Sequence, residues 1–275
     1  MRYSGMVVVL AFAAAACSGS GDSDPQPSAT AVASEEALPM ASTEAPSEAP
    51  AVKGRSEKEE NDLYEFGYSY PDAAAALPGL RAMLDRKLDD TKGELVSSAR
   101  SDKAEMTKDG FPYHAHSMQV DWKVVTDLPG WLSLSSEMYQ YSGGAHGMSG
   151  FDTLLWDRGA DTARKPMDLF TSQDALRDAL RTPFCDGLDK ARAGKRGEPV
   201  QRDSGQMFTE CIDPTAQTLI LGSTNRKTFD RIGVLVAPYE AGPYAEGSYE
   251  VTVPVTGKVM AALKPQYRSA FSVKP

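Results

Sequence analysis

The tract from Ser18 to about Glu60 is the feature that most limits how this 275-residue chain can fold. It is dominated by Ala, Ser, Pro and Glu and contains no aromatic residue. Such a composition cannot bury enough apolar surface to offset the entropy lost on ordering, and its prolines and acidic residues favour an extended chain. We therefore predict a disordered tether over residues 17–60 and one globular domain over residues 61–275, which is long enough to bury a full core.

The first sixteen residues have the composition of a secretory signal peptide. Arg2 supplies positive charge, and Met6 to Ala16 form an apolar run. This run is shorter than the roughly 20 apolar residues that a membrane-spanning helix needs. A polar tract follows at once, which does not fit the first helix of a domain. We expect residues 1–16 to be cleaved and the protein to be exported.

Ala14-Ala15-Ala16-Cys17 resembles a bacterial lipobox, although Ala14 stands where a leucine is more usual. In a lipobox the cysteine is acylated and becomes the mature N-terminus. Cys185 and Cys211 can pair with each other outside the cytoplasm, which leaves Cys17 as the odd cysteine unless lipid takes it. Ser18 follows in place of Asp, so no inner-membrane retention signal is evident. These features predict a lipid anchor at Cys17, with the outer membrane, facing the periplasm, as the expected location.

Charge argues against nucleic acid as a partner. The chain has a formal net charge of -9, and residues 18–60 hold nine acidic and three basic residues. Without Arg2 of the signal segment, residues 61–275 are left with -4. They contain no basic stripe of the kind that nucleic-acid-binding domains show.

The remaining residues predict an α+β domain. Alternating aromatic residues from Tyr64 to Tyr70 indicate a strand, and leucines at helical spacing from Leu77 to Val96 indicate a helix with Pro78 in its first turn. We expect a second helix from Ser172, its N-cap, to Ala193, a short helix over residues 257–263, and strands at 117–126, 131–141, 151–156, 218–221, 232–237 and 249–255. Strands grouped in this way predict a single domain in which helices pack mainly on one face of an antiparallel sheet.

A disulfide between Cys185 and Cys211 would close a loop of about 26 residues and contribute about 3.5 kcal/mol on the chain-entropy model. The loop from Lys190 to Arg202 is charged and Gly-rich, so we expect the bond to restrain it. Neither cysteine lies in a CxxC motif or at a predicted helix start, the settings that favour a catalytic thiol.

Two stretches rich in Tyr and Gly carry the strongest motifs. The first reads Tyr-Gln-Tyr-Ser-Gly-Gly-Ala-His-Gly over residues 139–147 and is followed by Asp-Leu-Phe at 168–170. The second reads Pro-Tyr-Glu-Ala-Gly-Pro-Tyr-Ala-Glu-Gly over residues 238–247 and precedes the last predicted strand. In this order they resemble the extracytoplasmic domain of the anti-sigma factor RsiV, a domain of unknown function also found beside peptidoglycan deacetylase domains. The resemblance covers most of Asp62 to Phe271.

RsiV-like proteins sense lysozyme by binding it, so the resemblance implies a binding module. This sequence differs from RsiV in having no transmembrane helix and no sigma-binding segment, and it has no separate deacetylase domain. We therefore expect the shared module on a lipid anchor. Its predicted binding residues come from the two motifs: Tyr141, Gly143, Gly144, His146, Tyr239, Tyr244 and Glu246.

The histidines allow a catalytic alternative. His114 and His116 would share one face of a strand, and with His146 they could hold zinc with one position open for water. The simpler interpretation is that Gly143, Gly144 and Gly147 permit positive φ in a tight turn. His146 would then hydrogen-bond to the backbone of that turn. We expect no metal and no cofactor.

The loop glutamates allow a second alternative. Glu240, Glu246 and Glu250 could supply the carboxylate pair that glycoside hydrolysis requires, although solvated carboxylates would look the same in sequence. Tyr139, together with the tyrosines of the predicted site, could stack on sugar rings, anchor a protein partner or pack in the core. The sequence therefore predicts a non-catalytic envelope module that binds a cell-wall polymer or a wall-degrading protein such as lysozyme. The first alternative is a peptidoglycan hydrolase or deacetylase that uses His146 or the Glu240/Glu246 loop, and a third possibility is a purely structural or assembly lipoprotein.

Overall fold

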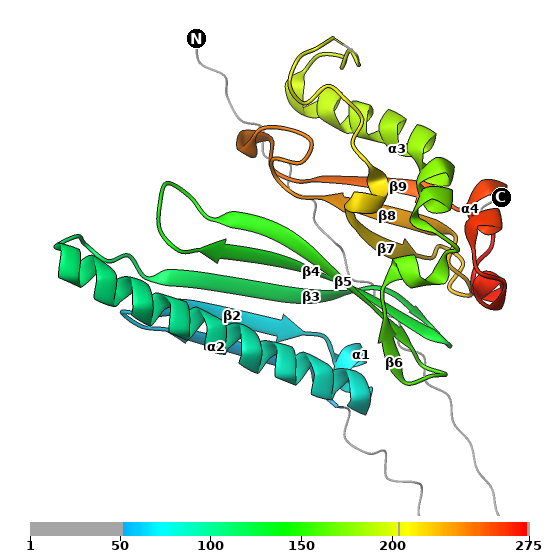
Figure 1. Ribbon diagram of the computed structural model, residues 1–275. Helices are drawn as coiled ribbons and strands as arrows, with labels where there is room; N and C mark the ends of the chain where they lie inside the picture. The colour runs from blue at the N-terminus through cyan, green and yellow to red at the C-terminus, as the bar shows by residue number, and fades with distance from the viewer. Residues whose placement is uncertain (1–51, 203, 274–275) are drawn as a thin grey trace, which may run out of the picture. The chain divides into compact units, whose positions relative to one another are not determined.

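A computed structural model describes residues 52–202 and 204–273, and these residues form two β-sheets (Figure 1). The expected signal peptide, the lipidated Cys17 and most of the tether lie outside the described residues. The larger sheet contains six strands in sequence order: β1 (Arg55–Glu60), β2 (Tyr64–Tyr70), β3 (His116–Leu128), β4 (Trp131–Tyr141), β5 (Met148–Asp157) and β6 (Thr162–Arg164). The smaller sheet contains β7 (Thr218–Gly222), β8 (Arg231–Val236) and β9 (Tyr249–Pro254).

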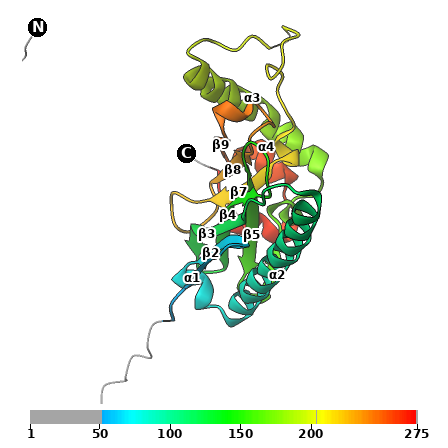
Figure 2. The ribbon, with the colours of Figure 1, turned by 90° about the vertical axis from the view of Figure 1, so that its left-hand side faces the viewer.

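The longest helix, α2, covers one face of the six-stranded sheet (Figure 2). It follows the short helix α1 (Asp72–Ala75) and spans Pro78–Asp109, with Pro78 in its first turn as predicted. Buried leucines of α2 pack against the aromatic side of β2, where Tyr64, Phe66, Tyr68 and Tyr70 are all buried. The helix continues well beyond Val96. Its last turns are polar and exposed, so they show no apolar pattern, and the helix ends at Gly110, which adopts φ +76°.

The α+β class is confirmed, but the expected single antiparallel sheet is wrong in two respects. First, β2 and β3 pair in parallel, because α1 and α2 connect them as a crossover that returns the chain to the same end of the sheet. Second, β7, β8 and β9 form a separate antiparallel sheet. Its core includes side chains of α3 (Gln173–Arg196) and α4 (Gly257–Ala262), so the two sheets are covered by different helices.

The helix starts agree with the sequence. The Ser172 hydroxyl accepts a hydrogen bond from the Ala175 amide at 3.1 Å, which confirms Ser172 as the N-cap of α3. Short 3-10 turns complete the fold: η1 (Pro166–Leu169), η2 (Pro214–Ala216), η3 (Tyr244–Glu246) and η4 (Pro265–Ala270).

Strand β1 corrects the predicted end of the tether. The polar composition of residues 55–60 predicts that they belong to the disordered tether. They instead pair with β2 in an antiparallel register, from Arg55↔Tyr70 to Glu60↔Glu65. Every second side chain of β1 faces α2. Lys92 of α2 lies 2.9 Å from a Glu57 oxygen and 2.6 Å from a Glu59 oxygen, and these hydrogen bonds raise the pKa of Lys92. Backbone pairing and ion pairs thus hold an edge strand that has no apolar face.

Candidate functional site

The two Tyr- and Gly-rich segments lie against each other in the structure, which the sequence did not predict. Residues 142–147 connect β4 to β5, and residues 237–248 connect β8 to β9. The His146 ring stacks on the Tyr244 ring with centroids 3.9 Å apart and an interplanar angle of 16°. The Tyr239 ring lies 5.6 Å from Tyr244 and 6.4 Å from His146. We call these three residues the aromatic cluster.

The turn that carries His146 is organised by its own backbone. His146 Nδ1 lies 2.9 Å from the Gly147 carbonyl oxygen, which confirms the predicted hydrogen bond to the turn. The Tyr141 hydroxyl donates to the Gly144 carbonyl at 3.1 Å. Gly143 and Gly144 adopt φ values of +105° and +90°, so both require the freedom of glycine, as predicted.

Gly147 is needed for a different reason than the one predicted. Its φ is not positive, so the expectation of a left-handed conformation is wrong at this position. A Cβ atom there would lie 2.4 Å from Cζ of Tyr139 and 2.5 Å from the Gln140 carbonyl oxygen. Glycine therefore permits the Tyr139 ring to lie directly against the turn.

Glu246 links the second loop, residues 237–248, to helix α3. Its two carboxylate oxygens accept hydrogen bonds from Arg196 of α3 at 2.9 and 3.1 Å, and the Tyr249 hydroxyl also donates to it. Partial burial acts to raise the pKa of Glu246, but the hydrogen bonds from Arg196 and Tyr249 outweigh it and hold this pKa below its ordinary value. Glu246 is therefore a charged, mostly buried partner of Arg196, and its role in binding stays a prediction.

The other two loop glutamates, Glu240 and Glu250, differ from Glu246 in their surroundings. Glu240 is exposed, and its side chain has no partner in the part of the chain that the structure describes. Glu250 is an exposed residue of β9. Both oxygens of Glu246 are engaged by Arg196, and Tyr249 also donates to it, so Glu246 is not a free carboxylate, whereas Glu240 and Glu250 have no side-chain partner within the described residues.

Arg192 and Arg196 of α3 hold the surrounding loops. Neither was among the predicted site residues. Arg192 is fully buried and donates to the carbonyl oxygens of Ala241 at 2.8 Å and Glu210 at 2.9 Å. Arg196 also donates to the Phe208 carbonyl at 3.1 Å. Their i, i+4 spacing places both on one face of the helix, but charged residues at this spacing also occur on solvated helix faces.

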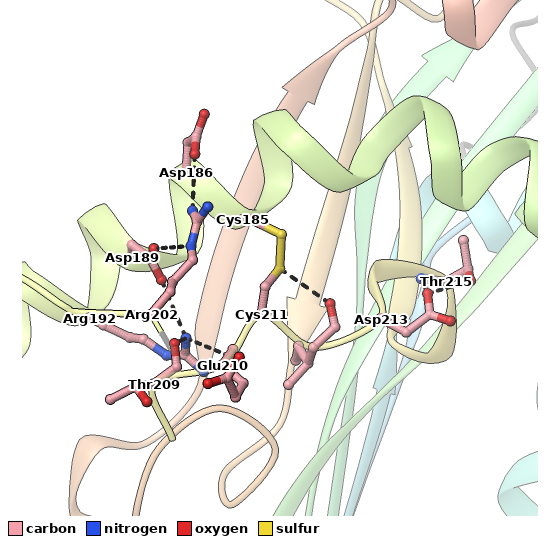
Figure 3. Close-up of a disulfide and its surroundings, with 11 residues drawn as sticks. Cys185, Asp186, Asp189, Arg192, Arg202, Thr209, Glu210, Cys211, Asp213 and Thr215 are labelled. Carbon is pink, nitrogen blue, oxygen red and sulfur yellow. Dashed lines mark hydrogen bonds and ion pairs between the residues drawn. A yellow bond between two sulfur atoms is a disulfide. The ribbon is translucent and has the colours of Figure 1, made fainter. Parts of the chain in front are cut away.

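The disulfide between Cys185 and Cys211 joins α3 to the segment that follows it, with Cα atoms 5.4 Å apart (Figure 3). This confirms the predicted pairing. Arg202 of the same segment forms ion pairs with Asp186 and Asp189 of α3, as Figure 3 also shows. Ion pairs as well as the disulfide therefore hold the segment that follows α3 against this helix.

The three histidines do not assemble. His116 is buried, and its Nε2 atom lies 3.0 Å from an Asp102 oxygen of α2, whereas His114 is exposed. Across residues 52–202 and 204–273 no group of three or more His, Cys, Asp or Glu side chains is arranged to hold a metal ion. Within the same residues, no helix combines the length and the apolar character needed to cross a membrane.

Comparisons with known proteins found one family model and several solved structures that this chain resembles. Residues 57–149 match the model of a family described as deacetylase PdaC. A crystal structure of a DUF3298 family member from Bacteroides fragilis has a TM-score of 0.51 and 18% sequence identity, over 80% of this chain and 97% of the other. A DUF3298 family protein from Pseudomonas aeruginosa has a TM-score of 0.43 and 14% identity, over 81% and 97%. No curated protein sequence matches.

The first structural likeness shows that this chain has the fold of a DUF3298 family member. The sequence match adds that residues 57–149, which include most of β1, all of β2 to β4 and the turn with His146, are PdaC-like. Together they are consistent with a DUF3298/PdaC-like domain, whereas a specific relation to RsiV is not shown.

Proposed function

We propose that this protein is a lipid-anchored module of the cell envelope that binds, without catalysis, a cell-wall polymer or a wall-degrading protein. The observation that carries the proposal is the aromatic cluster. His146 and Tyr239 are both exposed, Tyr239 to 47%. His146 lies on a loop between two strands of the larger sheet, and Tyr239 lies on a loop between two strands of the smaller sheet. Exposed aromatic rings on loops held by a rigid scaffold are typical of recognition surfaces.

The cluster is held in place before any ligand arrives. Arg196 and Glu246 fix the loop that carries Tyr239 and Tyr244, and the Tyr244 ring in turn supports His146. Tyr239 has φ +71°, a left-handed conformation that costs a residue with a side chain about 1–2 kcal/mol. Strain of this kind persists where the surrounding structure imposes it, and it concentrates at functional sites. A preorganised surface loses less entropy on binding.

The proposed location follows from the N-terminal sequence. The lipobox-like segment that ends at Cys17, followed by Ser18, favours attachment to the outer membrane with the domain facing the periplasm. A lipid-anchored domain in that position would meet the cell wall.

The test is co-sedimentation of the full-length chain, purified in nonionic detergent, with peptidoglycan sacculi. We expect the protein to pellet with intact sacculi, and the variants His146→Ala and Tyr244→Ala to pellet at least fivefold less. Phe111→Ala is the matched control, because Phe111 is an exposed aromatic residue outside the cluster. If the protein stays soluble, lysozyme is the next ligand to test. Binding to neither would refute the proposal.

A deacetylase or hydrolase is the second candidate, favoured by the match of residues 57–149 to the family described as deacetylase PdaC. His146 lies within that match and is exposed. This candidate predicts that the supernatant of the same experiment contains released acetate or sugar fragments, and that His146→Ala abolishes their release. Bound protein with neither acetate nor sugar fragments in the supernatant would reject it.

A further inference from the structure

A groove of about 480 Å³ crosses four strands of the six-stranded sheet. It lies on the face opposite α2: because side chains alternate along a strand, Gly67 and Ser69 of β2 point away from the helix that covers Phe66 and Tyr68. Its volume falls within the roughly 300–1,000 Å³ of small-molecule sites. Its lining includes Lys58, Ser69, Gln119, Asp121, Glu137 and Tyr139.

The floor of the groove depends on Gly67. A Cβ atom at this position would lie 1.9 Å from Oε1 of Gln119, so the Gln119 side chain folds across the glycine. Gln119 Nε2 donates to a Glu65 oxygen at 3.0 Å, which holds the amide in this position. The centre of the groove therefore presents a fixed amide and not an apolar surface.

Two of the three carboxylates that line the groove are paired with cations. Asp121 is paired with Lys123 at 3.0 Å and accepts a hydrogen bond from Ser69. Glu57 is bound by Lys92 from the helix side. The other two charged lining residues are Lys58 and Glu137, which carry opposite charges. Neither has a hydrogen-bond or ion-pair partner within the described residues. With Glu65, which holds the Gln119 amide, the groove carries a small excess of negative charge beside both donors and acceptors. Such a surface is complementary to an uncharged, hydroxyl-rich ligand and repels a polyanion.

Tyr139 adds an aromatic surface to this polar lining. Its side chain is 37% exposed, and its ring lies against Gly147 of the turn that carries His146. The ring is therefore both accessible and restrained. Aromatic rings with a polar tip suit ligands that are apolar on one face and hydroxylated at the edges, as sugar rings are. Tyr139 also connects the groove to the turn of the aromatic cluster.

We infer that this groove binds an uncharged glycan chain, with Tyr139 stacking on a sugar ring and Lys58, Gln119 and Glu137 hydrogen-bonding to its hydroxyl and amide groups. The inference rests on the proposed binding function and names its ligand class and a second contact surface beside the aromatic cluster.

The experiment is isothermal titration calorimetry of the full-length chain in nonionic detergent with the hexamer of N-acetylglucosamine as the probe. We expect binding that weakens at least tenfold in Tyr139→Ala and about threefold in Glu137→Gln. Glu137→Gln keeps the shape of the side chain, so it tests the groove even if Tyr139→Ala disturbs the turn. Phe111→Ala and Glu94→Gln, exposed positions outside the groove, should leave the dissociation constant unchanged.

Salt and sacculi separate the possible outcomes. Because the ligand is uncharged, the dissociation constant should stay constant between 50 and 500 mM NaCl. Absence of hexamer binding, or binding that is insensitive to both groove variants, overturns the inference. If the protein then still pellets with sacculi through His146 and Tyr244, the proposed function survives; if it does not bind sacculi or lysozyme, both fail. A change of oligomeric state in Tyr139→Ala, seen by light scattering, would assign this face to a second copy of the chain and also overturn the inference.

Discussion

The ion pair between Glu246 and Arg196 allows the support of the aromatic cluster to be tested directly. Replacing Glu246 with Gln keeps the side-chain shape but removes the charge that Arg196 binds. The two side chains are 17% and 18% exposed, which places the pair between exposed pairs, worth about 0–1 kcal/mol, and buried pairs, whose disruption costs about 3–5 kcal/mol. We therefore expect Glu246→Gln to lower the free energy of unfolding by about 2 kcal/mol.

Urea denaturation of the chain from Ser18 to Pro275 at pH 7 measures this loss. With an m-value of about 2 kcal/mol per molar urea, the midpoint should fall by about 1 M with unchanged slope. Glu240→Gln is the matched control, because Glu240 lies in the same loop and its side chain has no partner within the described residues. It should shift the midpoint by less than about 0.3 M.

The pH dependence supplies the result that would refute this reasoning. The pKa of Glu246 is lowered in the folded protein, so its contribution to stability is complete above the unfolded value of about 4.3 and is lost as the pH falls through the folded pKa. The difference between the wild type and Glu246→Gln should thus be constant from pH 7 to about pH 5.5 and shrink towards pH 3. A difference that is the same at pH 7 and pH 3, or no difference at pH 7, would show that the ion pair does not hold the loop.

Three further predictions concern other parts of the fold. Replacing Cys185 and Cys211 together with Ser should lower the free energy of unfolding by about 3.5 kcal/mol, as urea denaturation would show; a loss below about 1 kcal/mol would mean that Arg192, Arg196 and Arg202 restrain the segment sufficiently. Gly147→Ala should lower the free energy of unfolding by about 1–3 kcal/mol, because it forces Tyr139 aside, and should weaken sacculus binding. Gly130→Ala is the control, because a Cβ atom there meets nothing within 4 Å, and it should be tolerated. Lys92→Met should speed amide hydrogen exchange of residues 55–60 by releasing β1, whereas Lys108→Met, at an exposed position of α2, should not.

The sequence by itself determined the local elements of this fold. The aromatic alternation of β2, the position of Pro78 in α2, the Ser172 N-cap and the need for glycine at 143 and 144 were all predicted and are confirmed. Each of them depends on residues within a few positions of one another, where side-chain periodicity, capping and backbone sterics act. The cysteine pair was predicted by counting, because residues 61–275 hold only two cysteines and therefore allow a single pairing within the domain.

Only the tertiary structure decided what lies together. Strand β1 has no apolar periodicity because it is held by backbone hydrogen bonds and ion pairs, which leave no pattern of buried residues in the sequence. Arg192 and Arg196 look like residues of a solvated helix face until the loops over α3 are placed. The contact between His146 and Tyr244 joins residues almost a hundred positions apart. No local rule couples such distant positions, because their approach is set by how the two sheets pack on each other.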